Sequence, residues 1–447
     1  MRDPGPSFQR TPDPRQRARG RHYRWMVLVV AFFGVFGALG LGRFGYSAIL
    51  PSMQQSLDLS GAAAGSLASW NLAGYTIMAA VGGVLASKLG QRKVITAGIT
   101  ITAAGMLITG LANELGVASF GRLVTGIGNG MVLVPSVTLM AAWFDAQRLG
   151  FASSIVSAGA SPAMVVAGLA IPRLIAAGGD DGWRLAWYLF AGLTVIMAVL
   201  CATLLRDRPA GSSPPGGELV LDKSAPANLR ARLPKPSLEL KRIIGSGYAW
   251  HLGLIYAFYG AGLLIYFTFF QKRLTTDLGY SAETAGYLFL ILGVAGLFGG
   301  ALWGSISDQI GRKLAITLML TFSGVGSLLF ALRPNVSTLA VSAVLFGASG
   351  PAVPGLVGVA CSEKFGYRLA SASLGFVTIL VGFGQTLGPY IGGVMSDSLG
   401  SLGSTYLFSA GLFFAGAFAA LMLGEGGLDT GERVQVLPPL PEQRVVK

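Results

Sequence analysis

Cysteine, histidine and charge are scarce in this chain. Its 447 residues include 2 cysteines and 2 histidines, and only 12% of the residues are charged. Cys201 and Cys361 stand far apart, so the sequence offers no disulfide framework and no cluster with metal-ligand spacing. The glycine runs lie inside apolar stretches, where they form no phosphate-binding loop, and no catalytic triad is recognisable. We therefore expect no metal, no cofactor and no enzymatic activity.

Acidic residues are absent from the middle of every long apolar run. Hydrophobic residues make up 52% of the chain, which is too apolar for a soluble protein of this size. A run of about 20 apolar residues crosses a hydrocarbon core of about 30 Å as a helix. The sequence predicts twelve such helices, at residues 25–50, 62–87, 94–112, 117–143, 149–175, 183–205, 245–271, 282–307, 314–332, 337–361, 369–396 and 404–424.

The formal net charge of +13 is distributed unevenly along the chain. A charge of this size can indicate nucleic-acid binding. Here most of the 33 Lys and Arg residues fall in the two tails and in alternate loops, which is the positive-inside pattern of membrane proteins. We therefore expect contact with the lipid bilayer and not with nucleic acid. The predicted location is the plasma (inner) membrane, with several membrane passes and with both termini cytoplasmic.

A ten-residue signature occurs twice. The segment from Gly83 to Arg92 recurs 221 positions later, from Gly304 to Lys313, each time at the basic end of an apolar run. This repeat predicts an all-α membrane protein of two pseudo-symmetric six-helix bundles. The expected organisation is a disordered basic tail, a first bundle, a cytoplasmic linker, a second bundle and a cytoplasmic tail, at residues 1–20, 21–205, 206–242, 243–424 and 425–447.

These motifs resemble those of the major facilitator superfamily. The loop pattern Gly-x-x-x-Asp-Arg/Lys-x-Gly-Arg-Arg/Lys fits the second copy at Gly304, Asp308 and Arg312. The first copy keeps Gly83 and Arg92 but has Ser87 in place of the acid. Further similarities to the superfamily are found in helices four and eleven, in the segments 122–128 and 384–393. Short aromatic matches at 23–25, 143–144 and 182–184 resemble the bacterial oxalate/formate and monocarboxylate transporter branch.

The resemblance implies a secondary transporter that works by alternating access and functions as a monomer. Its partner would be a small-molecule substrate, with or without a proton. Asp308 would then form a latch, an interaction with basic residues and an opposing helix dipole that holds the cytoplasmic side closed. Alternatively, the loop is merely anchored at lipid headgroups. The residues expected to gate or couple transport are Gly83, Arg92, Arg122, His251, Gly304, Asp308, Arg312, Gly388 and Pro389.

Arg43 is the main candidate for substrate binding. It lies about 27 Å along the first helix from Trp25, and an arginine inside a membrane is costly unless it has a function, such as holding a carboxylate. The alternative is an arginine that extends to the outer headgroups. Tyrosines and asparagines at helical spacing either line a cavity or pack, and Arg122 and His251 can also be simple hydrogen-bonded core residues. The predicted substrate-binding residues are Arg43, Tyr46, Asn71, Tyr75, Asn129, Tyr256, Tyr259 and Tyr266.

One candidate cation matches one carboxylate, so we expect the substrate to be a small organic anion of the monocarboxylate type. The alternative is a proton-driven efflux antiporter for drugs or amphiphilic metabolites, which the acid-poor interior and the glycine-proline motif also allow. A receptor or scaffold would require a soluble domain, and the longest loop, 206–242, is too short for one.

Overall fold

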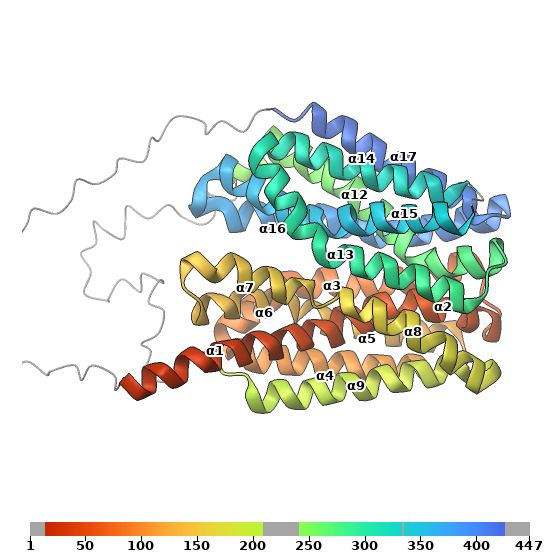
Figure 1. Cartoon of the computed structure of the whole chain (residues 1–447), viewed down its shortest axis with the longest axis horizontal. Coiled ribbons are helices and arrows are strands. Elements are labelled where there is room, and N and C mark those ends of the chain that lie inside the picture. Colours follow the sequence, from red (N-terminus) through yellow and green to blue (C-terminus); the bar gives the residue numbers. More distant parts are fainter. Residues whose placement is uncertain (1–13, 209–240, 333–334, 425–447) are drawn as a thin grey trace, which may run out of the picture.

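The computed structural model in Figure 1 describes residues 14–208, 241–332 and 335–424. These residues are almost entirely helical and contain no strand. Helix α1 begins at Pro14 and so includes part of the predicted N-terminal tail. The rest of that tail, most of the predicted linker and the predicted C-terminal tail lie outside the described residues.

Long apolar helices dominate both halves of the chain. Eleven helices of the described residues are long and apolar enough to cross a membrane. Helix α3 adds a further helix of 29 residues. The first half contains α1 (Pro14–Val35), η1 (Phe36–Phe44), α2 (Gly45–Ser56), α3 (Gly61–Leu89), α4 (Gln91–Gly110), α5 (Leu115–Gly130), α6 (Leu133–Trp143), α7 (Ala146–Ala158), α8 (Ser161–Gly178), η2 (Gly179–Asp181) and α9 (Gly182–Leu204). The second contains α12 (Gly247–Lys272), η3 (Arg273–Asp277), α13 (Ala282–Ile310), α14 (Arg312–Ala331), α15 (Val336–Ser349), η4 (Gly350–Ala352), α16 (Val353–Leu399) and α17 (Leu402–Leu421). The predicted all-α membrane fold is confirmed.

Several spans are interrupted where the sequence places proline or glycine. The fifth span divides into α7 and α8 just before Pro162, and the tenth contains the 3-10 turn η4 around Pro351. Proline lacks the backbone N–H that a continuous helix requires, which accounts for both breaks. The predicted boundary between helices ten and eleven was wrong in one respect, because α16 is helical across it. Helix α16 nevertheless belongs to two candidate membrane spans, because it contains the end of Val336–Phe365 and the whole of Ala372–Leu399.

The two halves form two layers in Figure 1, with α1 to α9 in one layer and α12 to α17 in the other. Helix α1 begins at one end of the bundle, and α9 and α17 finish at the same end. We call this the termini end and the opposite end the distal end. The arrangement agrees with an even number of passes in each half.

At the distal end, the halves touch through bare backbone. Helix α3 crosses α16 so closely that a Cβ on Gly65 would lie 2.1 Å from the carbonyl oxygen of Pro389. Helix α8 crosses α13 in the same way, since a Cβ on Gly168 would lie 2.4 Å from the carbonyl oxygen of Gly286. Small residues permit such close approach of helices in a membrane. These two crossings close the distal end.

Toward the termini end, the repeated glycines are not packed against the opposite half. A Cβ on Gly83 would meet Val134 of its own half, and a Cβ on Gly304 would meet nothing within 4 Å in the described part of the chain. Neither repeated glycine therefore forms a crossing between the halves of the kind found at the distal end.

The two repeated loops share one backbone conformation. Gly90 ends α3 with φ +91° and Gly311 ends α13 with φ +86°. Their ψ angles, 144° and 160°, complete a combination that is accessible in practice to glycine alone. The equivalent positions thus turn in the same way, as expected of duplicated bundles.

Candidate functional site

The first membrane helix contains a π-helical segment, η1, which presents Arg43 near its end. Two side chains of α5 bind its backbone. Arg122 Nη1 donates to the carbonyl oxygen of Gly42 at 2.7 Å. Asn129, with its amide nitrogen turned toward η1, donates to the carbonyl oxygen of Ala38 at 2.9 Å. The wider turns of a π-helix are frequent at functional sites, and here α5 supplies the hydrogen bonds that support them.

Arg122 is fully enclosed, with 1% of its surface exposed. Besides Gly42, its Nε donates to the carbonyl oxygen of Leu67 at 3.4 Å. Its guanidinium carbon also lies 4.6 Å from the ring centre of Tyr46 and 5.4 Å from that of Trp187. Its Nε and Nη1 atoms both donate to backbone carbonyls. This agrees with the prediction that Arg122 is a hydrogen-bonded core residue more than with a role in gating or coupling.

Arg43 points into the interface between the halves and not toward the lipid headgroups. Its Nη2 donates to Gln385 Oε1, on α16 of the opposite half, at 3.0 Å. Its guanidinium carbon lies 5.1 Å from the ring centre of Tyr75 and 5.5 Å from that of Phe44. The Nε atom is buried and has no hydrogen-bond partner among the described residues. No described Asp or Glu forms an ion pair with Arg43.

Tyrosines surround this guanidinium. Tyr256 and Tyr259 stack with ring centres 5.4 Å apart, and both lie near Arg43, as does Tyr75. The hydroxyl of Tyr259 is already used, because it donates to the carbonyl oxygen of Gly350 at 2.9 Å. No hydrogen bond from the hydroxyls of Tyr75 and Tyr256 is found within the residues described. Arg43, Tyr75 and Tyr256 therefore keep polar atoms available to a ligand.

The other predicted binding residues direct their polar groups into the protein. Tyr46 donates to the carbonyl oxygen of Ala64 at 2.7 Å, and Asn71 donates to that of Arg122 at 3.2 Å. Tyr266 shares a hydrogen bond of 2.9 Å with Ser342. Each of these hydrogen bonds, like that of Asn129 to η1, joins two helices of the same half.

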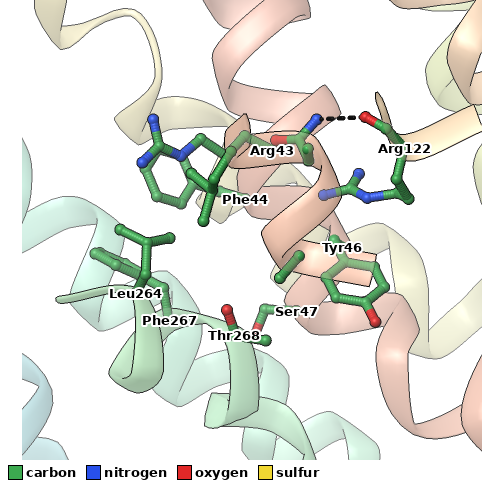
Figure 2. A pocket seen from close by; sticks show the side chains of 11 residues that line it. Arg43, Phe44, Tyr46, Ser47, Arg122, Leu264, Phe267 and Thr268 are labelled. Atoms are coloured by element: carbon green, nitrogen blue, oxygen red, sulfur yellow. Dashed lines mark hydrogen bonds between the residues drawn. The ribbon is translucent and has the colours of Figure 1, made fainter. Parts of the chain in front are cut away.

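A pocket lies beside Arg43, between the two halves. Figure 2 shows Arg43, Phe44 and Ser47 on one side of it and Leu264, Phe267 and Thr268 on the other. In this conformation its cavity volume is about 10 Å³, room for about one water molecule. Ser47 and Asn71 also line it, and their buried Oγ and Oδ1 atoms have no hydrogen-bond partner among the described residues.

The predicted gating residues of the second repeat form a local network. Arg312 donates to Asp308 Oδ1 at 2.7 Å and to Glu363 Oε1 at 2.9 Å. Glu363 belongs to α16 of the same half. In this conformation, Asp308 therefore binds Arg312 of its own half, and no hydrogen bond or ion pair from Asp308 to the other half is found among the residues described.

In the first repeat, an acid from outside the motif takes part. The backbone amide of Arg92 donates to Asp207 Oδ1 at 2.7 Å, and the Arg92 side chain binds the carbonyl oxygen of Ala202. Asp207 follows α9 and was not predicted, because nothing in the loop sequence indicates that a residue 115 positions away returns to it.

Gly388 and Pro389 lie where α16 crosses its neighbours. A Cβ on Gly388 would lie 2.6 Å from the carbonyl oxygen of Ala261, and Pro389 contacts Gly65 as described above. His251 is half-buried on α12 and makes no hydrogen bond within the residues described. Gln385, the partner of Arg43, was missed. Its signal in the sequence was a lone amide side chain inside an apolar run, next to Gly384.

Comparison with known proteins agrees with this geometry. The family model described as "Uncharacterised MFS-type transporter YbfB" matches residues 35–421. Monocarboxylate transporter 13 of Rattus norvegicus is 26% identical over 91% of this chain and 88% of its own length. The probable sulfoacetate transporter SauU of Cupriavidus necator is 23% identical over 92% and 95%. The phosphoglycerate transporter protein of Salmonella typhimurium is 24% identical over 91% and 90%.

Solved structures show the same fold. The D-xylose-proton symporter superimposes with a TM-score of 0.71 at 18% identity, covering 92% of this chain and 99% of that one. The nucleoside transporter NupG gives a TM-score of 0.68 at 17% identity, covering 90% and 98%. The predicted resemblance to the major facilitator superfamily, with monocarboxylate transporters among the relatives, is confirmed. The chain belongs to the MFS-type transporter family and is a transporter, not an enzyme.

Proposed function

We propose that this protein is a secondary transporter that moves a small organic anion with one carboxylate across the plasma membrane by alternating access. Its two bundles, residues 21–205 and 243–424, rock about the site at Arg43, and both termini are cytoplasmic. The observation that carries this proposal is the position of Arg43, a guanidinium between the halves with no acidic partner and a free Nε.

A positive charge without a counter-ion is costly inside a membrane protein, and binding an anion lowers that cost. Guanidinium and carboxylate match each other because two parallel N–H donors meet two oxygens. Arg43 can offer its free Nε together with Nη2 once the oxygen of Gln385 moves away. The aromatic faces and free hydroxyls of Tyr75 and Tyr256 can then contact the remainder of the substrate.

The relatives give independent support. Monocarboxylates, sulfoacetate and phosphoglycerate, which appear in the names of three relatives, all carry a carboxylate. The second anionic group of sulfoacetate or phosphoglycerate would require a second available cation. Arg122 is the less available cation, because its Nε and Nη1 donate to backbone carbonyls. A monoanion therefore fits this site best.

The test is uptake of labelled acetate, lactate and pyruvate into proteoliposomes, with and without an imposed proton gradient. Arg43→Ala should reduce uptake about a hundredfold, the usual consequence of removing one partner of a buried charge pair. Arg43→Lys should restore part of it. The matched control is Arg173→Ala, since Arg173 is exposed and donates within its own helix, to Leu169.

The same preparation tests the efflux alternative. If the wild type expels an amphiphilic dye against a proton gradient, takes up no carboxylate, and is unaffected by Arg43→Ala, the anion proposal is wrong and the antiporter is established.

A further inference from the structure

Gln385 is held in a fixed place by the helices around it. A Cβ on its neighbour Gly384 would lie 2.1 Å from the carbonyl oxygen of Ala257, so α16 rests directly on the backbone of α12. The Gln385 side chain passes over Gly260, where an added Cβ would lie 3.0 Å from its Cγ. The close helix contact therefore directs this amide across the interface toward Arg43.

The contact between Arg43 and Gln385 pairs a cation with a neutral group. Gln385 Oε1 accepts one N–H from Arg43 at 3.0 Å, much as a carboxylate oxygen would, but it adds no negative charge. A glutamate here would neutralise Arg43 and compete with an incoming anion. The Nε2 group of Gln385 makes no hydrogen bond within the residues described. It remains a free donor beside the guanidinium.

We propose that Gln385 is a specificity-determining residue and the second contact for the substrate carboxylate. This inference rests on the proposed function. Arg43 binds the carboxylate from one half, and Gln385 donates through Nε2 from the other, after its Oε1 has released Arg43. Because Gln385 is neutral, it adds no second charge beside Arg43, which favours monoanions over dianions.

The side-chain chemistry also links binding to the two halves. In this structure, Arg43 and Gln385 bind each other directly. A bound carboxylate lies between them and accepts from both, so the same ligand contacts both bundles. The amide group can make this exchange by rotating, because it carries both a donor and an acceptor.

The experiment measures uptake of labelled lactate, a monoanion, and labelled malonate, a dianion of similar size, by the full-length protein in proteoliposomes. Gln385→Ala should raise KM for lactate about tenfold and change kcat little, as expected from losing a hydrogen bond to a charged group. Gln385→Glu should lower lactate kcat/KM more than Gln385→Ala does. Gln385→Lys should raise the ratio of malonate to lactate kcat/KM about tenfold or more.

Thr386→Val is the matched control, since Thr386 is the next residue of α16 and makes no hydrogen bond within the described chain. Melting temperatures identify any of the three Gln385 variants that fails to fold. Uptake by the other two variants then tests the proposal. Unchanged lactate KM and an unchanged malonate ratio, in a protein whose uptake still depends on Arg43, overturn the role of Gln385 alone. Uptake that is insensitive to Arg43→Ala overturns the proposed function and this inference together.

Discussion

Asp397 caps the first turn of α3 from the opposite half, accepting the amide N–H of Gly61 through Oδ1 at 2.6 Å. Its Oδ2 accepts the next amide, that of Ala62, at 2.7 Å. The amide of Ala63 is bound by Ser60 Oγ, so the exposed donors of this helix start are shared between the halves. A carboxylate is favoured at a helix N-terminus by the helix dipole. The distal end is thus closed by a charged group as well as by close packing.

Asp397→Asn should shift the protein toward the conformation open at the distal end. The asparagine keeps one acceptor but loses the charge, which we expect to cost about 1–2 kcal/mol, or roughly a tenfold change in population. Spin labels at Gln55 and Ser398, with both native cysteines replaced, would report the distal distance. Asp181→Asn is the control, because Asp181 pairs with Arg184 of its own half. An unchanged distance distribution would show that this carboxylate does not hold the halves together.

Gly65→Val should prevent distal closure while leaving each half folded. Its Cβ would lie 2.1 Å from the carbonyl oxygen of Pro389, and neither backbone can move aside cheaply. Overpacking of about 2 kcal/mol or more would favour the distal-open state at least thirtyfold. We expect uptake to fall accordingly and the distal labels to separate. Gly192→Val is the control, because nothing lies within 4 Å of a Cβ there; normal uptake by Gly65→Val would contradict the crossing.

Gly304→Val should have the opposite conformational effect. A Cβ at Gly304 meets no atom of the described residues within 4 Å, so the melting temperature should be unchanged. When the termini end closes, the motif glycine should approach the other half, and the added side chain should block that step. The distal labels would then stay close while uptake falls. A fully active Gly304→Val variant would mean that this glycine is not part of a closing contact.

Arg122→Ala and Arg43→Ala should differ in stability. Removing Arg122 deletes its charged hydrogen bonds to the buried carbonyls of Gly42 and Leu67, which we expect to cost about 2–4 kcal/mol. Removing Arg43 deletes one half-buried hydrogen bond and should cost less than about 1 kcal/mol. Thermal unfolding in detergent can be followed by tryptophan fluorescence, since Trp187 lies against Arg122. Equal losses of stability would refute the division into a structural and a ligand-binding arginine.

The helix positions could be predicted because they depend on composition alone. The length of each apolar run predicts one membrane span, and the repeat at Gly83 and Gly304 predicts that the chain consists of two equivalent halves. The shared backbone angles of Gly90 and Gly311 agree with that pairing. Helix irregularities were predictable where proline marks them, as at Pro351. The π-helix η1 was not, because its supports, Arg122 and Asn129, come from another span.

The candidate site was predictable in part. Arg43 stood out because of the cost of its charge in a membrane. The tyrosines of α12 share helical spacing, yet Tyr259 and Tyr266 have hydrogen-bond partners, while none is found for Tyr256 within the described part of the chain. Spacing indicates which face a side chain occupies but not whether its hydroxyl meets a carbonyl. The same limit explains why Gln385, whose role depends on a residue 342 positions away, was missed.

The glycine crossings of α3 with α16 and of α8 with α13 have a consequence for the speed of the transport cycle. Interlocked side chains would have to leave their preferred rotamers before two such surfaces could part. At Gly65 and Gly168 there is nothing to disengage, so the surfaces can roll over one another with little rearrangement. The barrier to opening should then come mainly from rehydrating a few polar atoms, which would make rapid turnover compatible with a tightly sealed distal end.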